Sequence, residues 1–355
     1  MRHGLLFFFF CFALLLNAQP RLWDMGELEQ MRQDAEHAER RYILKQAEAA
    51  VGSQPVAVTD KAVARLGDKH NFESLSPYWW PDPENPGGPY KVKDGQFNPE
   101  CKAYDLPRMS ALNQRTHYLA KAYYITRDER YRKAFLQQID VWFLDRQTRM
   151  NPHFEYAQFI PGRNDGRGAA AGMIDAYNFI DVLESVRLVE SVRPIGRKRW
   201  RQLQDWFGDF AVWMQQSAMG QTAQNFDHNI GTAYDILLCY LSDFTGDAAT
   251  ARRVAENFEE KRINAQIEAD GTQPIQLRRT KVFSYSVSNL QHIMDMCVLQ
   301  KKVPSRVRKA LEHLSQYIGK AESFPHQEIG DWQQAERKLI ANIRRANQLG
   351  CDIRY

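Results

Sequence analysis

The chain has 355 residues, a net charge of +4 and an ordinary globular composition, with 44% hydrophobic, 25% charged and 12% aromatic residues. The length suits one large domain or two ordinary ones, and the composition excludes a disordered chain, a coiled coil and a collagen-like chain. Only the N-terminus holds a long apolar run, which excludes a multispan membrane protein. Basic residues are interspersed with acidic ones, so we expect no nucleic-acid partner.

Residues 1–18 have the pattern of a secretory signal peptide. Arg2 gives a basic start, Leu5 to Leu16 is apolar throughout, and Ala18 is a small residue at which a signal peptidase would cut. The apolar stretch is too short to span a bilayer. We therefore expect a mature chain of residues 19–355 that is periplasmic or secreted and has no membrane anchor.

Helical periodicity dominates the mature chain, and strand-like alternation is scarce. Several helices are apolar over more than one stripe, which is typical of helices packed on two sides in a ring of helical hairpins. With no interdomain linker or clear repeat, the pattern predicts one all-α domain over residues 19–355. The expected helices span residues 23–50, 107–126, 129–145, 173–190, 196–218, 229–244, 248–268, 285–300, 305–321 and 332–348.

Two long irregular segments, residues 67–106 and 147–172, interrupt these helices, and loops of this length usually carry a function. In the first, Trp79 and Trp80 lie between prolines and would form a stiff aromatic shelf. Such a shelf either stacks on the C–H face of a pyranose ring or pins the loop to the core, and both interpretations remain open. His70, taken alone, is typical of a structural histidine.

The familiar nucleotide, metal and hydrolase motifs are absent. The glycines of residues 162–172 follow no hydrophobic strand and precede no Gly-Lys-Ser/Thr, so we interpret them as a tight turn into the next helix. The mature chain has no CxxC pair, and we expect neither a metal nor another cofactor. Cys239 and Cys297 lie in apolar helical patterns and are predicted to be buried thiols. Arg163 and Arg167 are candidates to anchor an anionic substrate.

Two predicted helix starts could carry chemistry. Asp227 is the expected N-cap of a helix with Asn229 in its first turn, and a helix start suits a carboxylate ligand, although simple capping also explains the segment. Arg278 and Arg279 precede Tyr285 at a second helix start. Such cations would lower the phenol pKa from about 10, and a tyrosinate could then act as a base.

Taken together, these segments resemble the alginate lyase superfamily of secreted bacterial polysaccharide lyases. The resemblance runs from about residue 67 to 345 and implies an incomplete toroid of helical hairpins, (α/α)n, whose long loops bind an acidic polysaccharide. It also implies chain cleavage by β-elimination. The matching stretches are His70–Pro83, Gly87–Tyr90, Asp94–Glu100, Asn151–Pro152, Tyr156–Gln158, Ile160–Arg163, Gly166–Gly168, Gly231–Asp235, Asp270–Pro274 and Arg279–Ser286.

By this resemblance, Tyr285 is the base and acid, Arg279 tunes it, and Asn229 neutralises the substrate carboxylate. The usual family histidine position holds Ile230, whereas His228 stands two residues earlier and is a further catalytic candidate. This departure argues against a histidine-dependent anti elimination and favours β-mannuronate or β-glucuronate polymers over guluronate. The expected substrate-binding residues are His70, Trp79, Trp80, Gln158, Arg163, Arg167 and Arg278.

The leading hypothesis is therefore a monomeric lyase of polymannuronate, alginate or glucuronan. Two alternatives remain open. A glycoside hydrolase on a helical toroid would use a pair of carboxylates, for which Asp82, Asp165, Asp227 and Asp331 are candidates. A non-catalytic glycan-binding protein would keep the scaffold and bind the polymer without cleaving it.

Overall fold

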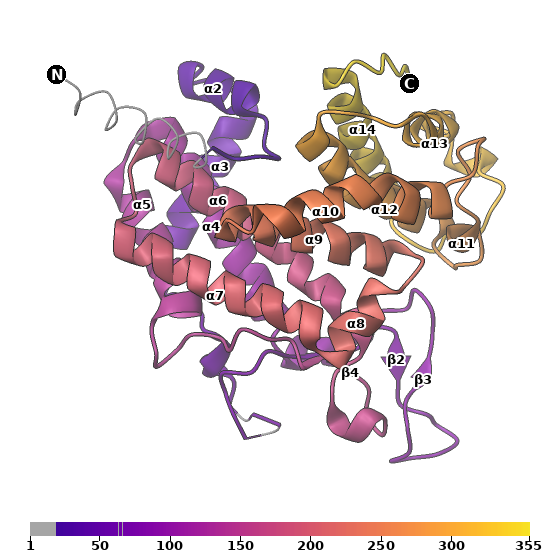
Figure 1. Ribbon diagram of the computed structural model, residues 1–355, viewed down its shortest axis with the longest axis horizontal. Coiled ribbons are helices and arrows are strands. Elements are labelled where there is room, and N and C mark those ends of the chain that lie inside the picture. The colour runs from indigo at the N-terminus through magenta and orange to yellow at the C-terminus, as the bar shows by residue number, and fades with distance from the viewer. Residues whose placement is uncertain (1–18, 63, 66) are drawn as a thin grey trace. The chain divides into compact units, whose positions relative to one another are not determined.

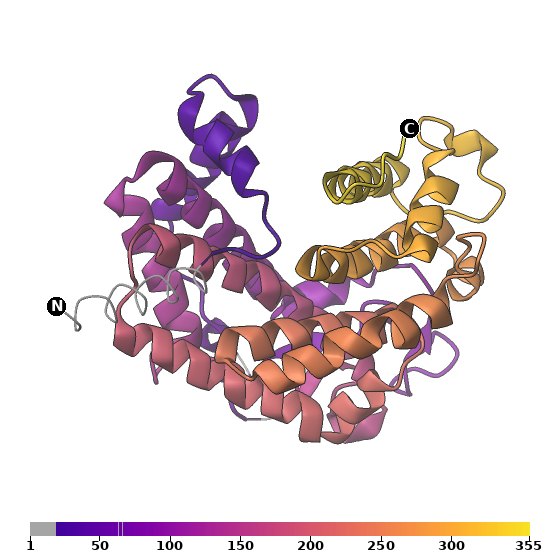
Figure 2. The same cartoon turned by 45° about the horizontal axis from the view of Figure 1, so that its top comes forward.

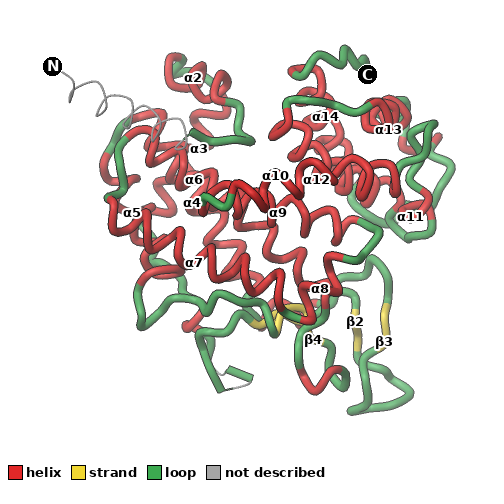
Figure 3. The backbone as a smooth tube through the Cα atoms, viewed as in Figure 1, coloured by secondary structure: helices red, strands yellow, loops and turns green. Residues whose placement is uncertain are grey.

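The computed structural model describes residues 19–62, 64, 65 and 67–355, and helices dominate this part of the chain (Figures 1 and 3). This confirms the predicted all-α class. The expected signal peptide falls on residues that lie outside the described ones. The α-helices are α2 (Met25–Gln33), α3 (Ala38–Val51), α4 (Leu106–Thr126), α5 (Glu129–Ile139), α6 (Asn178–Val192), α7 (Arg197–Gln216), α8 (Ala218–Gln224), α9 (Asn229–Thr245), α10 (Ala248–Phe258), α11 (Pro274–Leu277), α12 (Val282–Gln300), α13 (Ser305–Ser315) and α14 (Trp332–Gln348).

Shorter elements fill the predicted irregular segments and some helix ends. The strands are β1 (Glu73–Leu75), β2 (Trp79–Trp80), β3 (Lys91–Val92) and β4 (Tyr156–Phe159). Single-turn and 3-10 segments are η1 (Val58–Asp60), η2 (Pro99–Ala103), η4 (Asn164–Gly166), η5 (Ala170–Tyr177) and η7 (Ala321–Ser323), and π-helical turns are η3 (Asp140–Leu144) and η6 (Glu259–Asn264). Among the described residues, no helix combines the length and the apolar character that crossing a membrane requires.

The chain forms two compact units, each assembled from three separate segments. The first contains the described residues up to Phe72 together with Asp105–Pro152 and Asn178–Asp209. The second contains Glu73–Tyr104, His153–Tyr177 and Phe210–Tyr355. All four predicted catalytic residues belong to the second unit. The single domain expected over residues 19–355 stays a prediction.

In the first unit, α4 packs against α2, α3, α5 and α6. Its core contains a group of aromatic rings with centroids 4.8 to 5.9 Å apart, mostly edge to face, the arrangement that ring quadrupoles favour. These rings are Phe143, Phe179, Trp206 and Phe207.

The segment that precedes α2 is fastened to α6 by one buried carboxylate. Glu184 is 1% exposed and accepts the backbone N–H groups of Arg21, Leu22 and Trp23 at 2.8, 2.7 and 2.9 Å. Three hydrogen bonds to one carboxyl group offset the cost of burying its polar oxygens. Glu184 therefore holds this segment of the chain in place.

In the second unit, α9 is the most deeply buried long helix of those described, with every residue from Gly231 to Ser242 buried. It packs against α8, α10, α12 and η5, which explains why its sequence is apolar on more than one face. Gly246 closes the hairpin between α9 and α10 with φ at +88°, and the two helices lie side by side in both views (Figures 1 and 2). Cys239 and Cys297 are buried free thiols, as predicted.

Two short sheets hold the irregular segments of this unit. β1 pairs with β4 in parallel, and β2 pairs with β3 antiparallel. A Cβ atom on Gly168 or Gly172 would lie 2.3 or 2.5 Å from the Ala157 carbonyl oxygen, so only glycine lets this segment approach β4. The glycines of residues 162–172 thus serve close packing at the entry to η5, in agreement with the turn that the sequence suggested.

Candidate active site

Tyr285 lies in the first turn of α12, and Glu328 caps the start of that helix. The Glu328 carboxylate accepts the Ser284 N–H at 2.8 Å and the Ser284 hydroxyl at 3.0 Å. A carboxylate here also meets the positive end of the helix dipole. The Tyr285 side chain is half-buried, and its hydroxyl has no partner at normal hydrogen-bond geometry among the described residues. The helix start is therefore fixed, and the phenol oxygen is shielded from solvent.

Arg279 covers one face of the Tyr285 ring, and Asp94 holds the guanidinium in that position. The guanidinium carbon lies 4.2 Å from the ring centroid. Asp94 accepts Nη2 of Arg279 at 2.7 Å and Nε at 3.2 Å, a bidentate geometry that fixes the plane of the guanidinium. Thr280 donates its N–H and its hydroxyl to the same carboxylate at 3.1 and 3.0 Å. Asp94 thus orients the cation that the sequence placed beside the phenol.

Asp94 is a functional candidate that the sequence reasoning missed, although it lies within a matching motif. It is 185 positions from Arg279, a distance across which spacing predicts no contact. The sequence feature that could have indicated this contact is the glycine that follows Asp94. Gly95 has φ at +72°, and a Cβ there would lie 2.6 Å from the Thr280 hydroxyl oxygen. Burial raises the pKa of Asp94, but hydrogen bonds from Arg279 and Thr280 outweigh this and lower it overall, so the carboxylate is ionised at neutral pH.

The predicted fall in the pKa of Tyr285 is wrong. Burial raises this pKa well above its usual 10, and the Tyr78 hydroxyl raises it further. Arg279 acts in the expected direction but more weakly, and Asp94 offsets part of its charge. Tyr285 is consequently protonated at neutral pH. Tyr78 directly precedes β2, so the aromatic segment reaches the phenol through this residue.

His228 and Asn229 lie at the start of α9. The helix begins at Asn229 as expected, but its N-cap is His228 and not Asp227, because the imidazole Nδ1 accepts the Ile230 N–H at 3.4 Å. The same Nδ1 lies 3.3 Å from the Asn229 side-chain oxygen. Burial is the main cause that lowers the pKa of His228, and the charge of Arg279 adds to it, so the imidazole is neutral at pH 7. Arg279 therefore acts electrostatically on both His228 and Tyr285.

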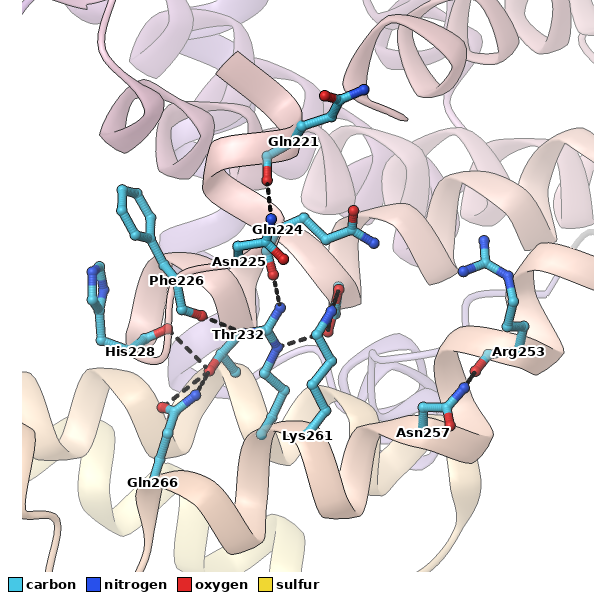
Figure 4. A network of polar contacts seen from close by, with 12 residues as sticks. Gln221, Gln224, Asn225, Phe226, His228, Thr232, Arg253, Asn257, Lys261 and Gln266 are labelled. Carbon is cyan, nitrogen blue, oxygen red and sulfur yellow. Dashed lines mark hydrogen bonds and ion pairs between the residues drawn. The ribbon is translucent and has the colours of Figure 1, made fainter. Parts of the chain in front are cut away.

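A buried arginine, Arg262, shapes the loop that carries His228. Gln224, Phe226 and His228 of this loop are labelled in Figure 4. Arg262 is 1% exposed and donates to the Gln224 carbonyl at 2.7 Å, to the Phe226 carbonyl, and to the Asp235 carboxylate at 2.6 Å. The Phe226 ring, held by this contact, stacks on the imidazole of His228 with centroids 4.7 Å apart. Arg262 and Asp235 were not among the sequence candidates, since two charges on separate helices give no local signal.

Cations lie on the two adjacent tryptophans of β2. The guanidinium carbon of Arg163 is 4.7 Å from the Trp79 ring centroid, and the Lys93 ammonium is 5.0 Å from that of Trp80. The Trp80 indole N–H donates to the Gln96 carbonyl at 2.9 Å, so it is occupied within the protein. Each tryptophan ring therefore has a positive charge over one of its faces.

The predicted binding residue Gln158 has its amide committed inside the protein. It is buried in β4 with φ at +50°, and its Nε2 donates to Asp175 at 2.8 Å. Ser74 donates to the other carboxylate oxygen of Asp175 at 2.8 Å. Burial raises the pKa of Asp175 to about 6 despite these two hydrogen bonds, which lower it.

The remaining predicted binding residues are His70, Arg167 and Arg278. His70 belongs to the first unit, where its Nδ1 is 2.6 Å from the Arg149 carbonyl oxygen and donates to it. Arg167 is exposed and pairs with Glu155, while Arg278 is exposed directly before Arg279. The structure thus groups Tyr285, Arg279 and His228 electrostatically.

Two of the four carboxylates considered for hydrolysis have structural partners. Asp331 caps α14 by accepting the Gln334 N–H at 2.9 Å, and Asp82 pairs with Lys91 at 2.9 Å. Asp165 and Asp227 are exposed. Within the described part of the chain, no three histidine, cysteine or carboxylate side chains are grouped as a metal site would require.

The comparisons with known proteins agree on one family. The family model described as "Alginate lyase" matches residues 57–321. The solved structure of an alginate lyase from Bacteroides ovatus aligns with a TM-score of 0.87 and 34% identity, covering 94% of this chain and 95% of that one. This agreement over almost the whole chain is consistent with the expected toroid of helical hairpins.

A second solved structure, alginate lyase A1-III from Sphingomonas species A1, aligns with a TM-score of 0.44 and 12% identity, covering 86% of this chain and 78% of that one. No curated protein matches the chain.

Proposed function

The chain belongs to the alginate lyase family, and we propose that it cleaves an acidic polyuronate, polymannuronate or glucuronan in particular, by β-elimination. In this reaction the C5–H bond of a uronate breaks, its electron pair forms the C4=C5 double bond, and the C4–O4 bond breaks. The departing O4 takes up a proton. The products are one ordinary chain end and one unsaturated uronate end.

This reaction gives each of the four candidate catalytic residues a proposed role. The C5 proton is weakly acidic because the neighbouring carboxylate already carries charge, so that charge must be offset as the enolate-like transition state forms. Asn229 and His228 would donate hydrogen bonds to the carboxylate from the start of α9. Tyr285 would remove the C5 proton and return a proton to O4, and Arg279 would favour the phenolate form.

The observation that carries this proposal is the stacking of Arg279 on Tyr285, with Asp94 fixing the guanidinium. A cation held over a phenol ring favours the charged form of that phenol more than a mobile one would. Because Tyr285 is protonated in the free protein, the base form is a minor species, and a high pKa makes that species a strong base. After it has removed the C5 proton, Tyr285 is again a neutral phenol and would hand a proton to O4.

Arg163, Trp79 and Trp80 support an anionic substrate, since they present cation and ring together. We place His70, Gln158, Arg167 and Arg278 in the same proposed binding role only through the family resemblance. Residues 1–18 have a signal-peptide pattern, so we also propose a periplasmic or secreted location.

The decisive experiment compares Tyr285→Phe with the native protein on polymannuronate, polyguluronate, glucuronan and hyaluronan, following the ultraviolet absorbance of unsaturated ends. We expect activity on a mannuronate or glucuronate polymer and its loss in Tyr285→Phe. Tyr124→Phe is the matched control, because Tyr124 is also half-buried and its hydroxyl donates to Glu29 at 3.2 Å. New reducing ends without absorbance would indicate a hydrolase, and binding without cleavage would indicate a non-catalytic protein. Full turnover by Tyr285→Phe would refute the proposed mechanism.

A further inference from the structure

A chain of buried hydrogen bonds connects the two helix starts that carry the candidate catalytic groups. It begins at the His228 carbonyl, which accepts the N–H of Thr232 at 3.2 Å and its hydroxyl at 3.5 Å (Figure 4). The Thr232 hydroxyl oxygen accepts a hydrogen bond from the Gln266 amide nitrogen at 2.9 Å. Its single proton has two alternative acceptors, the His228 carbonyl and the Gln266 side-chain oxygen at 3.2 Å. Gln266 lies just after η6, so this first half joins α9 to the neighbouring helical segment.

Asn289, a residue of α12, extends this series of hydrogen bonds from Gln266 to α12. Its Nδ2 donates to the Gln266 side-chain oxygen at 3.1 Å and to the Gln273 side-chain oxygen at 3.0 Å. Gln273 in turn donates to the Ser286 carbonyl at 3.2 Å. Ser286 directly follows Tyr285, so the hydrogen-bonded chain ends at the backbone beside the phenol. Both amide hydrogens of Asn289 are thus used, one toward each helix start.

Every side chain in this network is shielded from water. Thr232 and Asn289 are 0% exposed, and Gln266 and Gln273 are 3% exposed. Buried polar groups are costly unless they are paired, and a paired network has one low-energy arrangement. Apolar residues would fill the same space without fixing a register between the helices. The Asn289 side-chain oxygen has no partner among the described residues, so the two donated bonds alone set the orientation of this amide.

We propose that Thr232, Gln266, Asn289 and Gln273 are positioning residues that fix the His228–Asn229 end of α9 against the Tyr285 end of α12. The inference rests on the proposed function, because it assigns these residues the task of aligning the carboxylate-neutralising groups with the base. Misalignment between groups that act together in the transition state lowers kcat much more than it changes substrate binding.

Thr232→Val tests the proposal, since valine keeps the shape and removes the hydroxyl that joins His228 to Gln266. We expect kcat to fall between about 10- and 100-fold, with KM changed less than about threefold. Thr232→Ser, which keeps the hydroxyl, should retain at least about half of the native kcat, a rescue that a purely steric role would not give. Gln273→Met removes the hydrogen bond at the other end of the network. It should likewise lower kcat between about 10- and 100-fold while KM changes less than about threefold.

Thr116→Val is the matched control. Thr116 is also 0% exposed and helical, and its hydroxyl donates to the Leu112 carbonyl at 2.9 Å in the first unit. It should lose stability without losing kcat. If the native protein yields no unsaturated ends, the proposed function itself fails. If the native protein is active and Tyr285→Phe is not, an unchanged kcat in folded Thr232→Val and Gln273→Met would overturn the positioning role, as would an equal loss of kcat in Thr116→Val.

Discussion

Asp94 and Arg279 form a bidentate ion pair, with Nη2 to Oδ1 at 2.7 Å, and this pair holds the guanidinium over the Tyr285 ring. The carboxylate has two opposed effects on the phenol. It orients the cation that favours the phenolate, and its own charge raises the pKa of Tyr285. Substituting Asp94 and Arg279 one at a time should therefore distinguish the orienting effect of the Asp94 carboxylate from the effect of its charge on the Tyr285 pKa.

For Asp94→Asn, we expect the maximal rate to fall between about 10- and 100-fold, because an amide cannot make the bidentate, charge-assisted contact that orients Arg279. The alkaline rise in rate should begin at lower pH, since a negative charge near the phenol is removed. Initial rates of ultraviolet absorbance across pH 6 to about 10 would measure both effects. Asp82→Asn, which removes the carboxylate paired with Lys91, is the control and should leave the profile unchanged.

For Arg279→Met, we expect the opposite displacement along the pH axis. Arg279 lowers the pKa of Tyr285, so its loss raises that pKa, and the unpaired Asp94 adds to the rise. At any given pH below the phenol pKa, a smaller fraction of Tyr285 is then phenolate, and kcat/KM is lower. The measurement is the pH dependence of kcat/KM. If kcat/KM of Arg279→Met equals that of the native protein at every pH measured, the proposed electrostatic role of Arg279 is wrong.

Asp175 should make the protein less stable as the pH rises from about 4 to 6. Its pKa is raised from 3.8 to about 6, so the folded protein binds a proton that the unfolded chain has released in this interval. The contribution is fully present below pH 3.8, is lost by about pH 6, and amounts to about 3 kcal/mol. Denaturant unfolding of the native protein and Asp175→Asn at several pH values would show the difference. If the free energies of unfolding of the native protein and Asp175→Asn change with pH in the same way, this prediction is wrong.

Glu184→Gln should loosen the segment that precedes α2. Glutamine offers only one acceptor oxygen and no charge to the three N–H groups of Arg21, Leu22 and Trp23, and we expect a loss of about 2 kcal/mol. Thermal unfolding and limited proteolysis near residue 21 would measure it. Glu36→Gln, at an exposed position paired with Arg41, should leave both measurements unchanged.

Most helices could be predicted from the sequence, because their apolar periodicity reflects burial in the structure. The segment 129–145 and the helix at 229–244 are examples, each with bounds close to those observed. The break at residues 34–37 between α2 and α3 was missed, since charged residues continue across it without a proline or glycine. Residues 170–177 form a 3-10 segment where an α-helix was expected at 173–190, because tight packing of Gly172 on Ala157 constrains the backbone there.

Only those candidate site residues that lie in recognisable motifs could be predicted from the sequence. Motifs singled out Tyr285, Arg279 and Asn229 as candidates, and their catalytic roles stay a prediction. The direction of the shift in the Tyr285 pKa depends on burial and on Tyr78, which motif spacing does not show. The pairing of Asp94 with Arg279 and the amide network around Asn289 join residues far apart in the chain. Such contacts follow from tertiary packing and leave no local pattern.

The cations that lie on Trp79 and Trp80 bear on how tightly a polymer would be held in different media. A neutral glucan would gain ring contact there but no charge partner, whereas a uronate chain would gain both. Dissolved salt screens such surface attraction with a range of about 10 Å at 0.1 M, so capture of the polymer should weaken as ionic strength rises, in sea water more than in fresh water.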